Sequence, residues 1–126
     1  MLTLKARTIE AKSHRQTKIV FWFLFVGSRG GTNRIRIMSA LRKKPSNKNQ
    51  LATELGMDYK NIQHHIKILE GNNLVKKIGN HYGMTYYVST LFENSEAMFD
   101  EIVDKLHQLT NPIYYIRKEK AMRESI

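Results

Sequence analysis

Three residues at fixed spacing constrain the fold of this chain more than any other feature. Ala52 lies four residues before Gly56, and Ile62 lies six residues after it. A small residue lets two helices cross closely, a glycine permits the positive φ of a tight turn, and a β-branched residue packs the second helix onto the first. The spacing therefore predicts a helix-turn-helix, with helices over about 48–55 and 58–71.

Further elements are expected on the amino-terminal side of this motif. One helix is expected over 13–26, and another runs from an N-cap at Thr32 to a stop before Pro45. The apolar face of the second helix would consist of Ile35, Met38 and Leu41. With the helix-turn-helix, these segments predict a mainly α-helical protein.

A β-hairpin is expected after the helix-turn-helix. Two β-rich runs flank a turn that contains Gly79, Asn80 and Gly83. In the second run the residues that share one face are Met84, Tyr86 and Val88. The predicted fold class is therefore mainly α with a small β-hairpin.

Two apolar helices outside the motif predict a homodimer. Eight consecutive apolar residues run from Ile19 to Val26, and a helix that is apolar all round must bury every face. A helix over 95–109 has apolar residues at three- and four-residue spacing, typical of a seam between chains. Since a small domain covers only one side of such helices, a second copy is the expected partner. The expected interface residues are Ile19, Phe21, Trp22, Phe23, Phe25, Phe99, Ile102, Leu106 and Leu109.

Charge and cysteine content narrow the function. Twenty-one Lys and Arg against eleven Asp and Glu leave a net charge of +10, and residues 1–48 hold twelve bases with Glu10 as their only acid. An anionic partner is expected, either nucleic acid or an anionic membrane surface. The absence of cysteine excludes disulfides, thiol nucleophiles and thiolate metal sites, and favours a cytoplasmic location.

The apolar run from Ile19 to Val26 also has features of a secretory signal, because Lys12, Arg15 and Lys18 precede it. Eight apolar residues are too few to cross a bilayer, which needs about 20. The following "GSRGG" lacks the small-residue cleavage pattern. A buried helix is therefore expected here, with no membrane segment.

The adjacent histidines of the second motif helix are expected to have different roles. Side chains next to each other on a helix point about 100° apart, so His64 and His65 cannot chelate one metal ion. Asp58 is expected to cap this helix, and the core face would comprise Ile62, His65, Ile66 and Leu69. Lys60, Gln63, His64 and Lys67 would lie on the opposite face, with Tyr59 at the positive end of the helix. Such donors suit base edges and phosphates in a major groove.

The stretch "NQLATELGMDYKNIQHHIKILEGNNLVKKIG" resembles the ArsR-like superfamily of winged-helix transcription regulators. The preceding "FWFLFVGSRGGTNRIRIM" is similar to the leading helices of an archaeal-type branch. The chain departs from the superfamily pattern at Gln63, where Ser or Thr is usual, at Asn73, where Gly is usual, and in lacking the cysteine sensor motif. The resemblance implies a regulator that binds double-stranded DNA, and a two-fold dimer implies an inverted-repeat operator.

This resemblance implies three regions. These are a basic arm with an apolar dimerisation helix at 1–31, a winged helix-turn-helix at 32–90, and a dimerisation helix with a tail at 91–126. The hairpin would form the wing, on the DNA backbone or in the minor groove. The expected DNA-binding residues are Asn47, Asn49, Gln50, Tyr59, Lys60, Gln63, His64, Lys67, Lys76, Lys77, Asn80, His81 and Tyr82. Simple phosphate contacts or solvated bases are expected of Arg34, Arg36, Arg42, Lys43, Lys44 and Lys48.

The sequence gives little support for a metal site or a catalytic site. Asp100, Asp104 and His107 share one helix face, but without a second histidine a solvated acidic face is favoured over a metal site. No phosphate-binding loop or Gly-x-Ser-x-Gly motif is present, so no enzyme, cofactor or small-molecule ligand is expected. Two alternatives stay open: a non-specific architectural DNA-binding protein, and a basic module that meets other proteins or a membrane surface.

Overall fold

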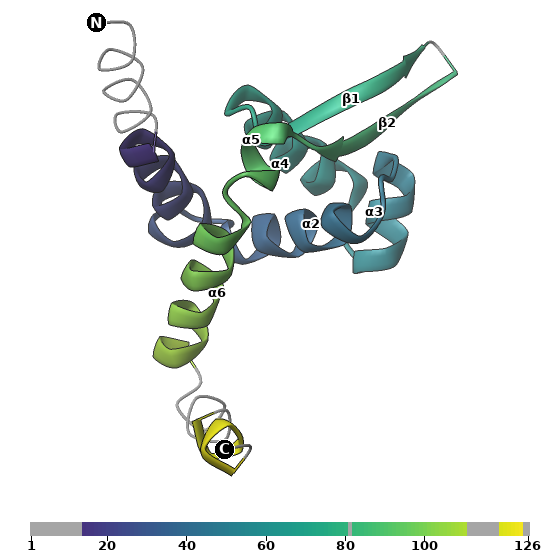
Figure 1. Ribbon diagram of the computed structural model, residues 1–126. Coiled ribbons are helices and arrows are strands. Elements are labelled where there is room, and N and C mark those ends of the chain that lie inside the picture. Colours follow the sequence, from purple (N-terminus) through teal and green to yellow (C-terminus); the bar gives the residue numbers. More distant parts are fainter. Residues whose placement is uncertain (1–13, 81, 111–118, 125–126) are drawn as a thin grey trace, which may run out of the picture.

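The computed structural model describes residues 14–80, 82–110 and 119–124 (Figure 1). Residues 14–22 are α-helical and continue into a π-helix, and residues 119–124 are also helical. The elements between them are η1 (Phe23–Gly27), α2 (Gly31–Lys43), α3 (Lys48–Leu55), α4 (Tyr59–Gly71), β1 (Val75–Asn80), β2 (Gly83–Val88), α5 (Thr90–Glu93) and α6 (Glu96–Thr110). His81 and the basic arm before residue 14 lie outside the described residues.

The predicted helix-turn-helix is confirmed as α3 and α4. Gly56 ends α3 with a φ of 62°, the left-handed conformation that the turn requires. The Met57 amide donates to the Ala52 carbonyl at 3.0 Å, and the side chain of Ile62 is completely buried. These contacts hold α4 across α3, so one face of α4 is fixed against the protein.

Helix α2 begins earlier than the sequence suggested, and the expected N-cap at Thr32 is wrong. Gly30 occupies the N-cap position with a φ of 89°, and Gly31 is the first helical residue. A Cβ on Gly31 would collide with the backbone of Phe25, so the glycine pair lets α2 start directly against η1. The buried face of α2 also differs from the expected one, because Ile35 is only partly buried. Its buried side chains are Arg34, Ile37, Met38, Ala40 and Leu41.

The hairpin is antiparallel, in a register from Val75 opposite Val88 to Asn80 opposite Gly83. At its base, Ser46 forms an isolated bridge to Tyr86, which ties the hairpin to the segment before α3. The expected alternation holds near this base, where Tyr86 is buried, whereas Met84 further out is 37% exposed. Figure 1 shows the hairpin projecting away from the helices, so its outer part has no core to cover it.

Aromatic rings form the core between the N-terminal helix, α5 and α6. Phe21 and Phe25 are 5.5 Å apart between ring centroids, and Phe92 and Phe99 each lie within 6.1 Å of one of them. Phe92 comes from α5, a short helix that the sequence did not predict. With this ring in place, the chain buries half of its own apolar run.

This core corrects the predicted dimer interface. Phe21, Phe25, Phe99 and Ile102 were expected to meet a second copy, yet each is at most 5% exposed in the single chain. The physical reason is the helix period, since residues four apart lie on one face and that face meets α5 and α6. Within the described residues, no helix is long and apolar enough to cross a membrane.

Candidate nucleic-acid interface

Helix α4 divides into a buried apolar face and an exposed polar face. The buried side chains are Ile62, His65, Ile66 and Leu69, as expected. The exposed ones include Lys60, Gln63, His64 and Lys67, and Tyr59 at the start of the helix is 43% exposed. Asp58 stands at the N-cap position, although its side chain makes no capping hydrogen bond. The structure therefore separates the two adjacent histidines, one inward and one outward.

The start of α3 is held by a reciprocal pair of hydrogen bonds. The Gln50 amide donates to Asn47 Oδ1 and the Asn47 amide donates to Gln50 Oε1, both at 2.8 Å. Both side chains were expected to contact DNA. Because their oxygens are engaged in this capping box, only their NH₂ groups face outward as donors.

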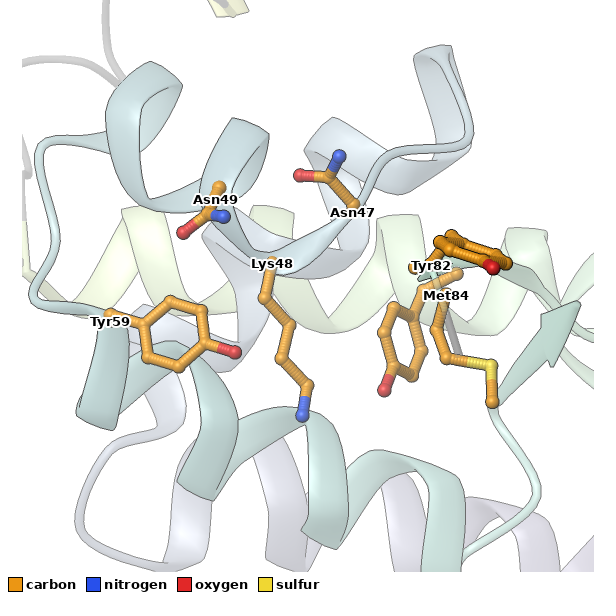
Figure 2. Close-up of a pocket in the computed structure, with 8 residues that line it drawn as sticks. Asn47, Lys48, Asn49, Tyr59, Tyr82 and Met84 are labelled. Atoms are coloured by element: carbon orange, nitrogen blue, oxygen red, sulfur yellow. The ribbon is translucent and has the colours of Figure 1, made fainter. Parts of the chain in front are cut away.

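A cleft of about 250 Å³ lies where the starts of α3 and α4 meet the wing (Figure 2). The Tyr59 ring extends toward the Lys48 side chain in it, and the Lys48 ammonium lies 5.6 Å from the ring centroid of Tyr86. The lining residues are Asn47, Lys48, Asn49, Tyr59, Tyr82, Gly83, Met84 and Tyr86. None of these residues carries a carboxylate, so the cleft favours an anion.

The cleft joins side chains that the sequence reasoning had treated separately. Asn47, Asn49, Tyr59 and Tyr82 were expected DNA contacts, and the fold brings them to one place. For Met84 and Tyr86 the sequence predicted only that they share one face of the hairpin. For Lys48 the sequence predicted only a phosphate contact or a solvated base. Its position as the first residue of α3 is the sequence signal that could have placed it in the cleft.

The wing carries fewer unengaged charges than its sequence suggests. Lys76 is exposed, whereas the Lys77 ammonium lies 3.6 Å from a carboxylate oxygen of Glu70 in α4. Near the turn, Asn80 Oδ1 accepts a hydrogen bond from the Tyr82 amide, and the Tyr82 side chain is 94% exposed. The Lys76 side chain and the Tyr82 side chain are therefore the exposed groups of the wing.

Two of the bases expected at a DNA surface have internal roles. Arg34 is only 3% exposed, which contradicts its expected place as a phosphate contact or solvated base. Arg42 lies 2.8 Å from Asp100 and stacks over the ring of Phe99 at 5.0 Å. That pairing also engages one carboxylate of the acidic face on α6. Arg34 faces η1 and Arg42 faces α6, because the side of α2 that carries each arginine is packed against that element.

A second surface lies on the N-terminal helix and is apolar. Ile19, Trp22 and Phe23 are 64%, 45% and 60% exposed. They line a cavity of about 420 Å³ together with Arg15, Lys18 and Gly27. Leu109, at the far end of α6, is 74% exposed. These four residues are the part of the predicted dimer interface that the chain leaves uncovered.

Comparison with known proteins agrees with the helix-turn-helix and wing described above. Residues 32–77 match the model of a family described as bacterial regulatory protein, arsR family. The chain has a winged helix-turn-helix fold. No curated protein matches its sequence.

Several solved structures share the fold. A probable transcriptional regulator from Pseudomonas aeruginosa superposes with a TM-score of 0.60 at 14% identity, over 90% of this chain and 89% of that one. A homodimeric winged helix-turn-helix DNA-binding domain from Mycobacterium bovis, a possible ArsR-family regulator, gives 0.57 at 14% identity, over 77% and 85%. The transcriptional regulator BldR from Sulfolobus solfataricus gives 0.51 at 14% identity, over 98% and 94%.

Proposed function

We propose that this protein is a homodimeric transcription regulator that binds double-stranded DNA in a sequence-specific way. Helix α4 would enter the major groove, and the wing would follow the adjacent backbone or minor groove. The leading segment 21–38 supports an assignment to the archaeal-type branch of the ArsR-like superfamily. The operator would be an inverted repeat, since a two-fold dimer presents two identical reading helices.

The observation that carries this proposal is the exposed face of α4. No acidic residue occurs from Tyr59 to Lys67, so nothing on this stretch repels phosphate. Gln63 and His64 offer hydrogen-bonding groups to base edges, while Lys60 and Lys67 offer charge to the backbone. The buried opposite face holds the helix rigidly, which direct readout requires.

The cleft beside α4 supports a contact to the DNA backbone. Its lysine, tyrosine hydroxyl and side-chain amides are donors, and half or more of protein–DNA hydrogen bonds go to phosphate and sugar. A backbone phosphate there would be approached from α3, from α4 and from the wing at once. Such a contact would fix the register of α4 in the groove.

The exposed apolar surface supports the dimer. Trp22 and Phe23 are large rings about half in contact with water, and a partner would gain that share of the about 1.5 to 3 kcal/mol that complete burial of such a side chain contributes. The Mycobacterium bovis domain of the same fold is homodimeric. A second copy on this surface would set the two reading helices about 34 Å apart, one turn of duplex.

Selection of bound sequences from a random duplex pool tests this function. The expected result is an inverted-repeat motif that the protein binds at least about 10³-fold more tightly than a scrambled duplex at the same salt concentration. The rival hypothesis is an architectural protein that coats DNA by charge, for which the net charge of +10 would suffice. A ratio near one, with no enriched motif, would support that rival and contradict specific regulation.

A further inference from the structure

The buried side chain of Arg34 connects three segments of the protein. Its Nε donates to the Leu24 carbonyl in η1 at 2.7 Å. Its Nη2 donates to the Arg29 carbonyl at 3.0 Å and to Ser28 Oγ, both in the link before α2. Its Nη1 lies 3.2 Å from Nδ1 of His65, on the buried side of α4. One residue of α2 therefore ties the N-terminal helix to the helix proposed to read DNA.

The partners of Arg34 are all neutral. They are backbone carbonyls, a hydroxyl and an imidazole, and none of the ion pairs within the described residues includes Arg34. Buried charges are normally paired with an opposite charge, because desolvation is costly. Burial lowers the pKa of Arg34, but a guanidinium stays protonated in proteins. The site therefore keeps a permanent cation that forms no ion pair with any residue the structure describes.

This cation determines the protonation of His65. A guanidinium has donors and no acceptor, so Nδ1 of His65 must accept the hydrogen bond. The imidazole is then neutral and carries its proton on Nε2. A proton on Nδ1 would remove the acceptor and place two buried cations 3.2 Å apart. The contact consequently exists only while His65 is neutral.

In the part of the chain that the structure describes, the charged or titratable groups that affect His65 disfavour its protonated form. Arg34 faces it from α2, and the ring of His64 on α4 lies 5.2 Å away between centroids. Arg34 in turn contacts a carbonyl of η1 and, in the link, a carbonyl and the Ser28 hydroxyl. Burial, then the charges of Arg34 and His64, lower the pKa of His65 below its ordinary 6.5.

The contact is also tight. Gly30 adopts a φ of 89° beside it, and a Cβ there would lie 2.7 Å from Cε1 of His65 and 3.1 Å from Nη1 of Arg34. Real side chains do not approach so closely, so only glycine at position 30 leaves room for the contact between Arg34 and His65. If the contact with His65 were lost, Arg34 would no longer connect α4 to the link.

We propose that Arg34 is a positioning residue that sets the orientation of α4 relative to the N-terminal helix, and that protonation of His65 releases it. The inference rests on the proposed function, in which α4 reads the DNA and the N-terminal helix forms the dimer. Acidification would then misalign the two reading helices and weaken binding to an inverted repeat. The protein would respond to pH through a histidine that never touches DNA.

The contact itself can be tested without DNA. Imidazole nitrogen shifts of His65, measured by NMR on the full chain at pH 7.5, should show Nε2 protonated and Nδ1 unprotonated. A proton on Nδ1 at that pH would overturn the proposal. The thermal midpoint should fall as pH drops below 6.5, since unfolded His65 binds a proton more readily than folded His65. His65→Asn, with an amide oxygen as acceptor and no titration, should lose less stability over this range.

The binding test uses a His64→Gln background, which removes the exposed neighbouring imidazole. In this background the selected duplex is titrated with and without His65→Asn, from pH 7.5 to 5.0 at constant ionic strength. At pH 7.5 the two proteins should bind within about twofold of each other. At pH 5.0 the protein that retains His65 should have lost about three- to tenfold more affinity, as expected for one proton per site. Identical pH profiles would overturn the switch.

Two further variants keep the test decisive. His65→Gln offers the same acceptor on a longer side chain and replaces the asparagine variant if that one does not fold. Arg34→Lys keeps the charge but cannot reach all four acceptors, so it should bind more weakly than wild type at pH 7.5 and respond less to pH. Wild-type affinity with an unchanged profile would contradict the positioning role. Failure to find any preferred duplex would contradict the proposed function alone, because the NMR measurement does not depend on it.

Discussion

The N-terminal helix and α4 are both divided between the core of the chain and a face left for something else. In the N-terminal helix the uncovered residues are apolar, with Trp22 45% and Phe23 60% exposed. In α4 the uncovered residues are polar, including Gln63 and His64. The buried faces of the two helices are both mainly apolar, whereas the exposed faces differ in polarity.

This difference indicates which partner each helix would accept. Exposed aromatic rings gain free energy when they leave water, so they favour a second apolar protein surface. Exposed amides, imidazoles and ammonium groups lose their water unless a partner replaces the hydrogen bonds, as base edges and phosphates do. The residues that a helix leaves outside the core are thus more informative about function than those it buries.

The largest expected effect comes from breaking the buried half of the N-terminal helix. Phe25→Ala should lower the free energy of unfolding by about 3 to 5 kcal/mol, since it removes a ring in contact with Phe21 and Phe99. Urea unfolding at several protein concentrations measures this loss. Phe23→Ala is the matched control, and its smaller effect should depend on protein concentration. Equal, concentration-independent losses would mean that the two faces do not differ.

The exposed half can be tested with Trp22→Glu and Phe23→Glu together. Neither ring belongs to the buried core, so the variant should remain folded but sediment near 14.8 kDa, whereas wild type should sediment at twice that mass. Affinity for an inverted repeat should fall about 100-fold or more, because the second half-site no longer binds within the same complex. A wild-type monomer, or a double variant that remains a dimer, would contradict the dimer proposal.

The polar face of α4 should give a smaller and more selective effect. Gln63→Ala or His64→Ala should weaken binding to the selected operator by about 1 to 3 kcal/mol and leave binding to random duplex nearly unchanged. Fluorescence anisotropy with both duplexes measures the difference. The thermal midpoint should not change, since both side chains are exposed. Equal loss on both duplexes would remove the two residues from base reading.

The smallest expected effect separates the two wing lysines. Lys76→Ala should flatten the plot of log affinity against log salt concentration by about one unit, the value for one lost phosphate contact. Lys77→Ala should change the slope less, because its ammonium lies 3.6 Å from Glu70 in the free protein. If both slopes stay unchanged, the wing does not contact the backbone.

Local features of the site were predictable from the sequence. The turn at Gly56 and the inward Ile62 depend on residues within a few positions of each other, and their spacing alone determines the turn. The opposite orientations of His64 and His65 follow from the same helix period. The cleft was less predictable, since Lys48 and Tyr86 are brought together by tertiary contacts such as the bridge between Ser46 and Tyr86.

The sequence by itself determined the turn of the helix-turn-helix and the face that α4 turns outward, because each depends on short-range geometry. Tertiary structure decided which half of the apolar run is buried, since that depends on Phe92 and Phe99 reaching it from distant segments. It also decided that Arg34 is internal. An arginine looks like a surface residue in a sequence, and only the carbonyls and the imidazole gathered around it by folding make its burial possible.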